Sequence, residues 1–89
     1  MYTLFRTTSF KKQYKKLSSI EQQLLKEIVT LLAEGEQLEQ KYKDHKLIGD
    51  FKDLRECHIK PDLLLIYKIN NDILELVLVQ VGNHSSLFK

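Results

Sequence analysis

The stretch Arg55-Glu56-Cys57-His58-Ile59-Lys60-Pro61-Asp62 runs directly into Leu63-Leu64-Leu65-Ile66-Tyr67, the most apolar segment of the chain. The first half combines an arginine, two carboxylates, a thiol, an imidazole and the single proline of the sequence. An ionisable segment that continues into a buried strand holds reactive side chains on a rigid support. We therefore expect both the fold and the functional site to be organised around this stretch.

Alternation of polar and apolar residues predicts a strand from Phe51 to Lys60. Successive side chains of a strand point to opposite faces. The odd positions, which include Cys57 and Ile59, indicate the core face. The even positions place Glu56 and His58 side by side on the other face.

The following segments predict two more strands. Leu63 to Ile69 is continuously apolar, as is typical of a central strand covered on both faces. Asn70-Asn71-Asp72 has the composition of a hairpin turn, and Ile73 to Val81 is again apolar. Gly82-Asn83 then ends the last strand and is followed directly by His84.

The N-terminal half predicts a short strand, Tyr2 to Arg6, and two helices. Ser18 and Glu21 form a capping box at the start of the second helix, and Gly35 is a natural stop. Apolar residues recur at helical spacing in both segments: Phe10, Tyr14 and Leu17, then Ile20, Leu24, Ile28, Leu31 and Leu32.

The predicted order is therefore β-α-α-β-β-β in a single domain, residues 1–89. We expect an α+β fold in which a helical hairpin packs on one face of a small, mostly antiparallel sheet. The segment from Leu38 to Gly49 is polar and irregular. A loop of that length in a compact domain is often functional.

Composition limits the classes of protein that remain. Charged residues make up 29% of the 89 residues, which is typical of a globular domain. The lone Cys57 excludes an internal disulfide, and no apolar run approaches the roughly 18 residues of a membrane span. The N-terminus also lacks the apolar segment of a signal peptide. We expect a cytoplasmic protein that does not contact a membrane.

Positive charge is concentrated near the N-terminus, where residues 1–17 carry five basic side chains and no acid. A basic helix of this kind suits a phosphate backbone. It is also typical of an ordinary solvated lysine face, and charge alone leaves both interpretations open.

The three histidines, His45, His58 and His84, all lie where a predicted element starts or stops. Each alone is readily explained as a surface or capping group, but Glu56 and Asp62 flank the second of them. Strand ends and loops are where a sheet presents reactive groups. The pattern as a whole therefore points to a site.

Zinc binding is an alternative use of these residues. The spacing of His45, Cys57, His58 and His84 matches no zinc motif, and adjacent strand residues such as Cys57 and His58 point to opposite faces. We therefore expect no metal or other cofactor, and we interpret Cys57 as a small core side chain. The sequence also lacks a Gly-rich phosphate loop, a GxSxG elbow and an HExxH motif.

Histidines with carboxylates on a basic surface suit general acid–base cleavage of a phosphodiester. RNA supplies its own nucleophile, the 2′-hydroxyl. An enzyme then needs to remove that proton, protonate the leaving 5′-oxygen and stabilise the charged phosphorane. Histidine titrates near neutral pH and can serve either proton step.

Three blocks of the sequence, Lys43 to Gly49, Arg55 to Tyr67 and Gly82 to Phe88, resemble the YafQ branch of the RelE-like toxins. The shared patterns are DHxLxG, R(D/E)CHxxPDxxLxY and GxHSxLF. The resemblance implies the RelE-like fold and a toxin of a bacterial type II toxin–antitoxin pair. Such toxins cut mRNA in the ribosomal A site without a metal and leave a 2′,3′-cyclic phosphate or 3′-phosphate. The implied partners are a cognate antitoxin and ribosome-bound mRNA, with DNA bound only through the antitoxin complex.

The resemblance also implies roles for individual residues. His58 and His84 would share proton transfer and phosphate contact, and His45 would be a base or a substrate contact. Asp62 would orient a histidine or the substrate. The full set of candidates is His45, Glu56, His58, Asp62 and His84 for catalysis, with Arg55, Lys46, Gln80 and Phe88 for substrate binding.

Two residues depart from the family pattern. Glu56 stands where aspartate is common, and Gln80 stands where relatives often carry arginine. A neutral amide cannot supply the same charge to a phosphorane, so Arg55 or a loop lysine substitutes or cleavage is weak. Phe88 would stack on a base or anchor the C-terminus in the core. The alternative functions are a weak or inactive relative that binds antitoxin or nucleic acid, and a metal-dependent hydrolase.

Overall fold

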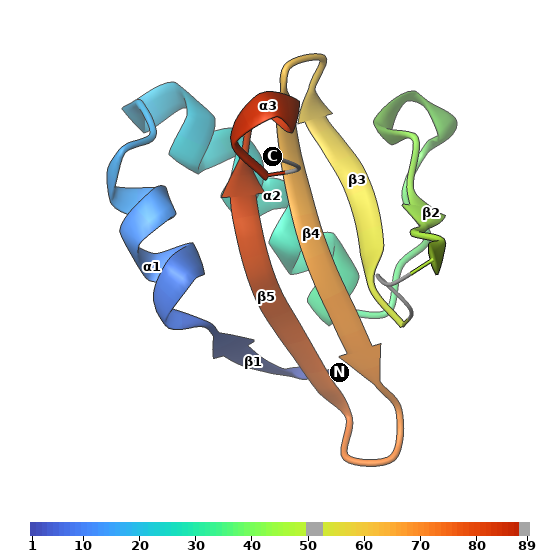
Figure 1. Ribbon diagram of the computed structural model, residues 1–89. Coiled ribbons are helices and arrows are strands. Elements are labelled where there is room, and N and C mark those ends of the chain that lie inside the picture. Colours follow the sequence, from blue (N-terminus) through green and yellow to red (C-terminus); the bar gives the residue numbers. More distant parts are fainter. Residues whose placement is uncertain (50–52, 88–89) are drawn as a thin grey trace.

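The computed structural model describes residues 1–49 and 53–87 (Figure 1). The elements in chain order are β1 (Thr3–Arg6), α1 (Thr8–Lys15), α2 (Ser19–Ala33), the 3₁₀ helix η1 (Gln40–Tyr42), β2 (His45–Lys46), β3 (Arg55–Lys60), β4 (Leu63–Asn70), β5 (Glu75–Gly82) and α3 (His84–Leu87). The strands form one sheet in the order β1-β5-β4-β3-β2. β1 pairs with β5 in parallel, and the other pairs are antiparallel.

A side-chain cap starts each of the two long helices, Thr7 for α1 and the predicted Ser18 for α2. Thr7 accepts a hydrogen bond from the Phe10 amide at 3.0 Å, and its own hydroxyl donates to the Val79 carbonyl of β5 at 2.6 Å. Ser18 and Glu21 form the reciprocal capping box of α2. Gly35 follows the end of α2 with a φ of +80°, a conformation that glycine adopts without strain.

The hydrophobic core lies between these helices and one face of the sheet. Figure 1 shows α2 behind the sheet and α3 in front of it. The buried core residues are Phe10, Leu25, Ile28, Val29, Leu32, Leu38, Cys57, Ile59, Leu63, Leu65, Tyr67, Leu76, Leu78 and Val81. Leu64 and Ile66 of β4 are also buried but lie outside this cluster. β4 is therefore covered on both faces, as its continuous apolar run predicts.

Several boundaries differ from the prediction. The segment from Leu38 to Gly49 contains η1 and β2 and is not structureless. β2 pairs through only two residues, too few to show a periodic pattern in the sequence. Ile73 and Leu74 belong to the β4–β5 turn, where Leu74 has a φ of +51°. The short helix α3 was not predicted from the sequence. β3 begins at Arg55, and Phe51, its expected start, lies outside the described residues.

Within the described residues, no helix is both long enough and apolar enough to cross a membrane.

An ion pair ties the end of β3 to the first turn of α2. Lys60 Nζ lies 2.8 Å from Glu21 Oε2, while Glu21 Oε1 accepts the Ser18 amide at 3.0 Å. The hydrogen bond from Lys60, followed by that from Ser18, lowers the pKa of Glu21 below its usual 4.5. A carboxyl whose pKa is depressed by folding stabilises the protein above its unfolded pKa. That stabilisation is lost as the pH falls through the folded pKa.

Glu21→Gln is therefore expected to destabilise the protein at pH 7 and to become nearly neutral well below pH 4.5. Glutamine retains a capping acceptor, so the variant mainly removes the charge. Urea unfolding of both proteins across this pH range measures the difference. Glu27→Gln, on an exposed position of the same helix, is the control. A destabilisation by Glu21→Gln that is the same at every pH would contradict the assignment.

Candidate active site

Four residues from four strands line up across the face of the sheet that α1 and α2 leave open. The strand register pairs His45 with Glu56, Glu56 with Ile66, and Ile66 with Gln80. Directly paired residues project to the same face, and neighbouring strands lie about 4.8 Å apart. Gln80 is thus two strands, about 10 Å, from Glu56. This row defines the floor of the candidate site.

Glu56 lies between two imidazoles. Its Oε1 atom is 3.9 Å from His45 Nε2 and 3.6 Å from His58 Nε2. Glu56 is only 7% exposed, whereas the side chains of His45 and His58 are 52% and 25% exposed. The buried carboxylate is therefore placed to stabilise a positive charge on either accessible ring.

The orientation of the His45 ring is fixed by a backbone contact. Nδ1 of His45 lies 2.7 Å from the carbonyl oxygen of Lys43, which has a left-handed conformation with a φ of 50°. A carbonyl oxygen only accepts, so Nδ1 carries the proton. Nε2 is then the atom of the neutral ring that can accept a proton, and it faces Glu56.

A second row places α3 beside the histidines. His58 pairs with Leu64, and Leu64 pairs with Gly82. A Cβ atom on Gly82 would lie 3.0 Å from Ser86 Oγ and 3.3 Å from Leu87 Cδ2. α3 therefore packs directly over Gly82, on the same face as Glu56 and His58. His84, the first residue of α3, is brought to this end of the sheet.

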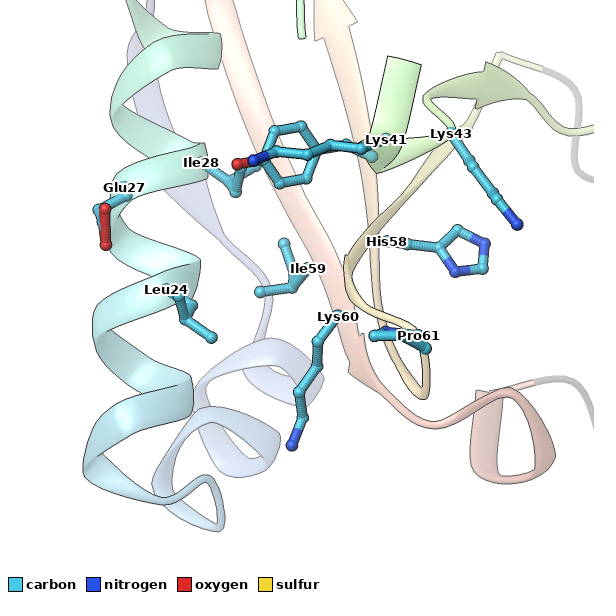
Figure 2. A pocket seen from close by; sticks show the side chains of 10 residues that line it. Leu24, Glu27, Ile28, Lys41, Lys43, His58, Ile59, Lys60 and Pro61 are labelled. Atoms are coloured by element: carbon cyan, nitrogen blue, oxygen red, sulfur yellow. The ribbon is translucent and has the colours of Figure 1, made fainter. Parts of the chain in front are cut away.

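His58 also borders a cavity of about 430 Å³ between α2, η1 and the end of β3. Figure 2 shows the His58 ring pointing away from Leu24 and Glu27 of α2. Three lysines, Lys41, Lys43 and Lys60, line the cavity. A lysine ammonium group that borders the same cavity as an imidazole suits a phosphate. Lys41 and Lys43 belong to the long loop whose lysines were considered as substitutes for the missing arginine, whereas Lys60 was not predicted to contribute.

The structure separates other candidates from this cluster. Arg55 and Lys46 pair with each other, one register position from Glu56 and His45, and so project to the opposite face. Asp62 lies in the β3–β4 turn, where its side chain is 81% exposed and 3.9 Å from Lys60 Nζ.

Phe88 lies outside the described residues. The cluster that geometry assembles is therefore His45, Glu56 and His58, with Gln80 on the same row and His84 at the adjacent end of the sheet.

The thiol of Cys57 is not available as a metal ligand. Cys57 is fully buried in the core, and burial raises the pKa of its thiol to about 12, so it is not a thiolate at neutral pH. His45 and His58 both face one oxygen of Glu56. In the described part of the chain, no three His, Cys, Asp or Glu side chains are grouped to hold a metal ion.

The sequence of this chain is similar to those of known bacterial toxins. Residues 2–89 match the family described as the bacterial toxin of type II toxin-antitoxin system, YafQ. The mRNA interferase toxin YafQ of Escherichia coli K12 is 40% identical over 65 residues, which is 72% of this chain and 68% of the relative.

Two solved structures are also similar over nearly the whole chain. A metal-bound toxin from Helicobacter pylori is 43% identical, with a TM-score of 0.88 over 99% of this chain and all of that one. The toxin chain of an E. coli DinJ–YafQ complex is 30% identical, with a TM-score of 0.85 and full coverage of both chains.

Proposed function

Because this chain belongs to the YafQ family of bacterial toxins of type II toxin–antitoxin systems, we propose that it is an mRNA interferase that cuts ribosome-bound mRNA. The cut would fall in the ribosomal A site, without a metal ion, by attack of the 2′-hydroxyl on the adjacent phosphate. The position of Glu56 between His45 Nε2 and His58 Nε2 carries this proposal. One similar solved structure is a metal-bound toxin. The proposal of a metal-free cut is supported by the described residues of this chain, in which no three His, Cys, Asp or Glu side chains are grouped to hold a metal ion.

The proton that leaves the 2′-hydroxyl goes to an imidazole. His45 suits this step because Nδ1 is committed to the Lys43 carbonyl and Nε2 is accessible. The 2′-oxygen then bonds to phosphorus while the bond to the 5′-oxygen breaks. His58 and His84 share the remaining tasks, protonation of the 5′-oxygen and contact with the phosphate. The products are a 2′,3′-cyclic phosphate and a free 5′-hydroxyl.

The charge of the phosphorane needs cations on the same face of the sheet. Arg55 projects to the other face, and Asp44 engages its guanidinium at 3.3 Å. Lys43 is better placed, because its side chain extends on the side of the His58 ring (Figure 2), whereas Lys60 is ion-paired with Glu21 of α2. We propose that Lys43 takes over part of the role that arginine at position 80 would have.

A single 2′-deoxy substitution tests the nucleophile. An mRNA with one deoxynucleotide immediately 5′ of a mapped cut is expected to resist cleavage there, while other cuts persist. The unmodified mRNA should carry a cyclic phosphate or 3′-phosphate at the new end. Cleavage that persists at the deoxy position, with a 3′-hydroxyl end, would instead indicate hydrolysis by activated water.

Gln80→Arg is expected to raise the cleavage rate on the order of tenfold, because a guanidinium stabilises a phosphorane better than an amide does. Position 80 lies on the same row as Glu56, so the new charge enters the site. Single-turnover cleavage of ribosome-bound mRNA measures the change. Gln80→Met, of similar length and neutral, is the control. If the arginine variant cleaves no faster than wild type, position 80 does not contribute to stabilising the charge of the phosphorane.

A weak or inactive relative that mainly binds an antitoxin is the second candidate, and Gln80 is the residue that favours it. In either case we propose a cognate antitoxin as partner, since a YafQ structure at 30% identity is a complex with DinJ. DNA would then be contacted only through the antitoxin complex. A ribosomal substrate would place the protein in the cytoplasm.

A further inference from the structure

Asp44, the residue immediately before His45, is anchored to two strands of the sheet. Its Oδ1 accepts a hydrogen bond from the Tyr67 hydroxyl at 2.5 Å and another from Arg55 Nε at 3.3 Å. Arg55 Nε also lies 3.3 Å from the Tyr67 oxygen. Arg55 of β3 and Tyr67 of β4 are direct cross-strand partners. The three side chains form one network, which we call the Asp44 anchor.

The anchor lies on the opposite face of the sheet from the candidate active site. Tyr67 is 1% exposed and belongs to the core beneath the helices. Adjacent residues of an extended segment project to opposite faces. With Asp44 held on the core side, His45 is directed to the open face, where its Nε2 meets Glu56.

Among the described residues, the backbone pairing of β2 with β3 that holds His45 is short. β2 consists of two residues, and both are exposed. Beyond these two residues, the Leu47 amide donates a backbone hydrogen bond to the Leu54 carbonyl. Lys43, whose carbonyl fixes the His45 ring, adopts a left-handed conformation that costs a non-glycine residue energy. Asp44 lies between Lys43 and His45, and its hydrogen bonds to Tyr67 and Arg55 can hold the Lys43 backbone and the His45 ring in this arrangement.

The Tyr67 hydroxyl remains a hydrogen-bond donor to Asp44 at neutral pH. Burial, and then the hydrogen bond to Asp44, raises the pKa of Tyr67 above its usual value. The hydroxyl therefore remains a donor throughout the pH range in which histidines titrate. Hydrogen bonds to an ionised carboxylate are stronger than those between neutral groups.

We propose that Tyr67 and Arg55 are positioning residues that act through Asp44 to hold His45 with Nδ1 on the Lys43 carbonyl and Nε2 toward Glu56. This assigns Arg55 to the support of the site and not to direct substrate contact. The catalytic consequence rests on the proposed function, whereas the orientation and tautomer of His45 do not. Misplacement of a reacting group by about 1 Å can cost up to about a hundredfold in rate, so loss of the anchor should lower kcat.

Imidazole nitrogen NMR of the whole protein, with cleavage kinetics on ribosome-bound mRNA, tests the proposal in Tyr67→Phe. Wild type should show His45 as the Nδ1–H tautomer, and Tyr67→Phe should shift it toward the Nε2–H form. The variant should lose about tenfold in kcat, with KM within about twofold. Tyr2→Phe is the matched control, because the Tyr2 hydroxyl donates to Asn71 Oδ1 at 2.7 Å. It should change neither readout.

Asp44→Ala and Asp44→Asn complete the experiment. Alanine should shift the His45 tautomer as Tyr67→Phe does, while asparagine, which keeps an acceptor oxygen for the Tyr67 hydroxyl, should restore much of the wild-type spectrum and kcat. Because Asp44 is partly exposed, these variants test the anchor even if Tyr67→Phe fails to fold. An unchanged His45 tautomer in folded Asp44→Ala would overturn the proposal, whatever the rate. A shifted tautomer in a protein that cuts no mRNA would support the anchor and contradict only the proposed function.

Discussion

Replacing His58 with alanine is expected to abolish growth inhibition and to reduce mRNA cleavage roughly 10²- to 10⁴-fold. The ring lies 3.6 Å from the buried Glu56 carboxylate and borders the cavity beside η1, a position that suits the proton transfer and phosphate contact proposed for it. His84→Ala is expected to have an effect of the same order. Growth after induced expression, followed by cleavage assays on purified protein, measures both.

The fold should survive these changes, because His58 is partly exposed and His84 is exposed. Thermal unfolding close to that of wild type would confirm this. Gln23→Ala, at an exposed position of α2, is the control and should remain toxic. Wild-type toxicity of both histidine variants would show that the imidazoles do not carry the chemistry.

Leu65→Ala is expected to destabilise the protein by about 2–5 kcal/mol, the usual cost of a large-to-small change in a close-packed core. Leu65 is 0% exposed at the centre of β4, between the strands that carry the site. For a domain of this size, the corresponding fall in Tm is at least about 8 °C. Denaturant unfolding monitored by circular dichroism measures the change.

Leu31→Ala provides the matched control. Leu31 is 37% exposed on α2, and alanine retains a high helix propensity, so its cost should stay within about 0.5 kcal/mol. Equal losses for the two variants would contradict the description of β4 as the centre of the core.

The sequence predicted the central strands because burial leaves a strong pattern there. The parity of residues 55–60 placed Cys57 and Ile59 in the core and Glu56 with His58 on the other face, and the structure confirms this arrangement. The capping box at Ser18 was also confirmed, because its two partners are only three residues apart. The comparisons confirm the YafQ resemblance and the α+β fold.

Contacts between distant segments could not be predicted in the same way. The bond between Tyr67 and Asp44 spans 23 residues, and Tyr67 was interpreted only as the end of an apolar run. The pairing of His45 with Glu56 depends on a two-residue strand that has no periodic signal. Arg55 is different, since its odd position already placed it with Cys57. Applying the strand parity to Arg55 would have separated it from Glu56.

Primer extension on a defined mRNA, translated in a purified system with a chelator present, tests the central claim most directly. The account predicts cuts within A-site codons when the protein is added, unaffected by the chelator and absent with His58→Ala. Free mRNA without ribosomes should remain intact. Cuts that disappear with the chelator, or an mRNA that stays uncut on translating ribosomes, would contradict the account.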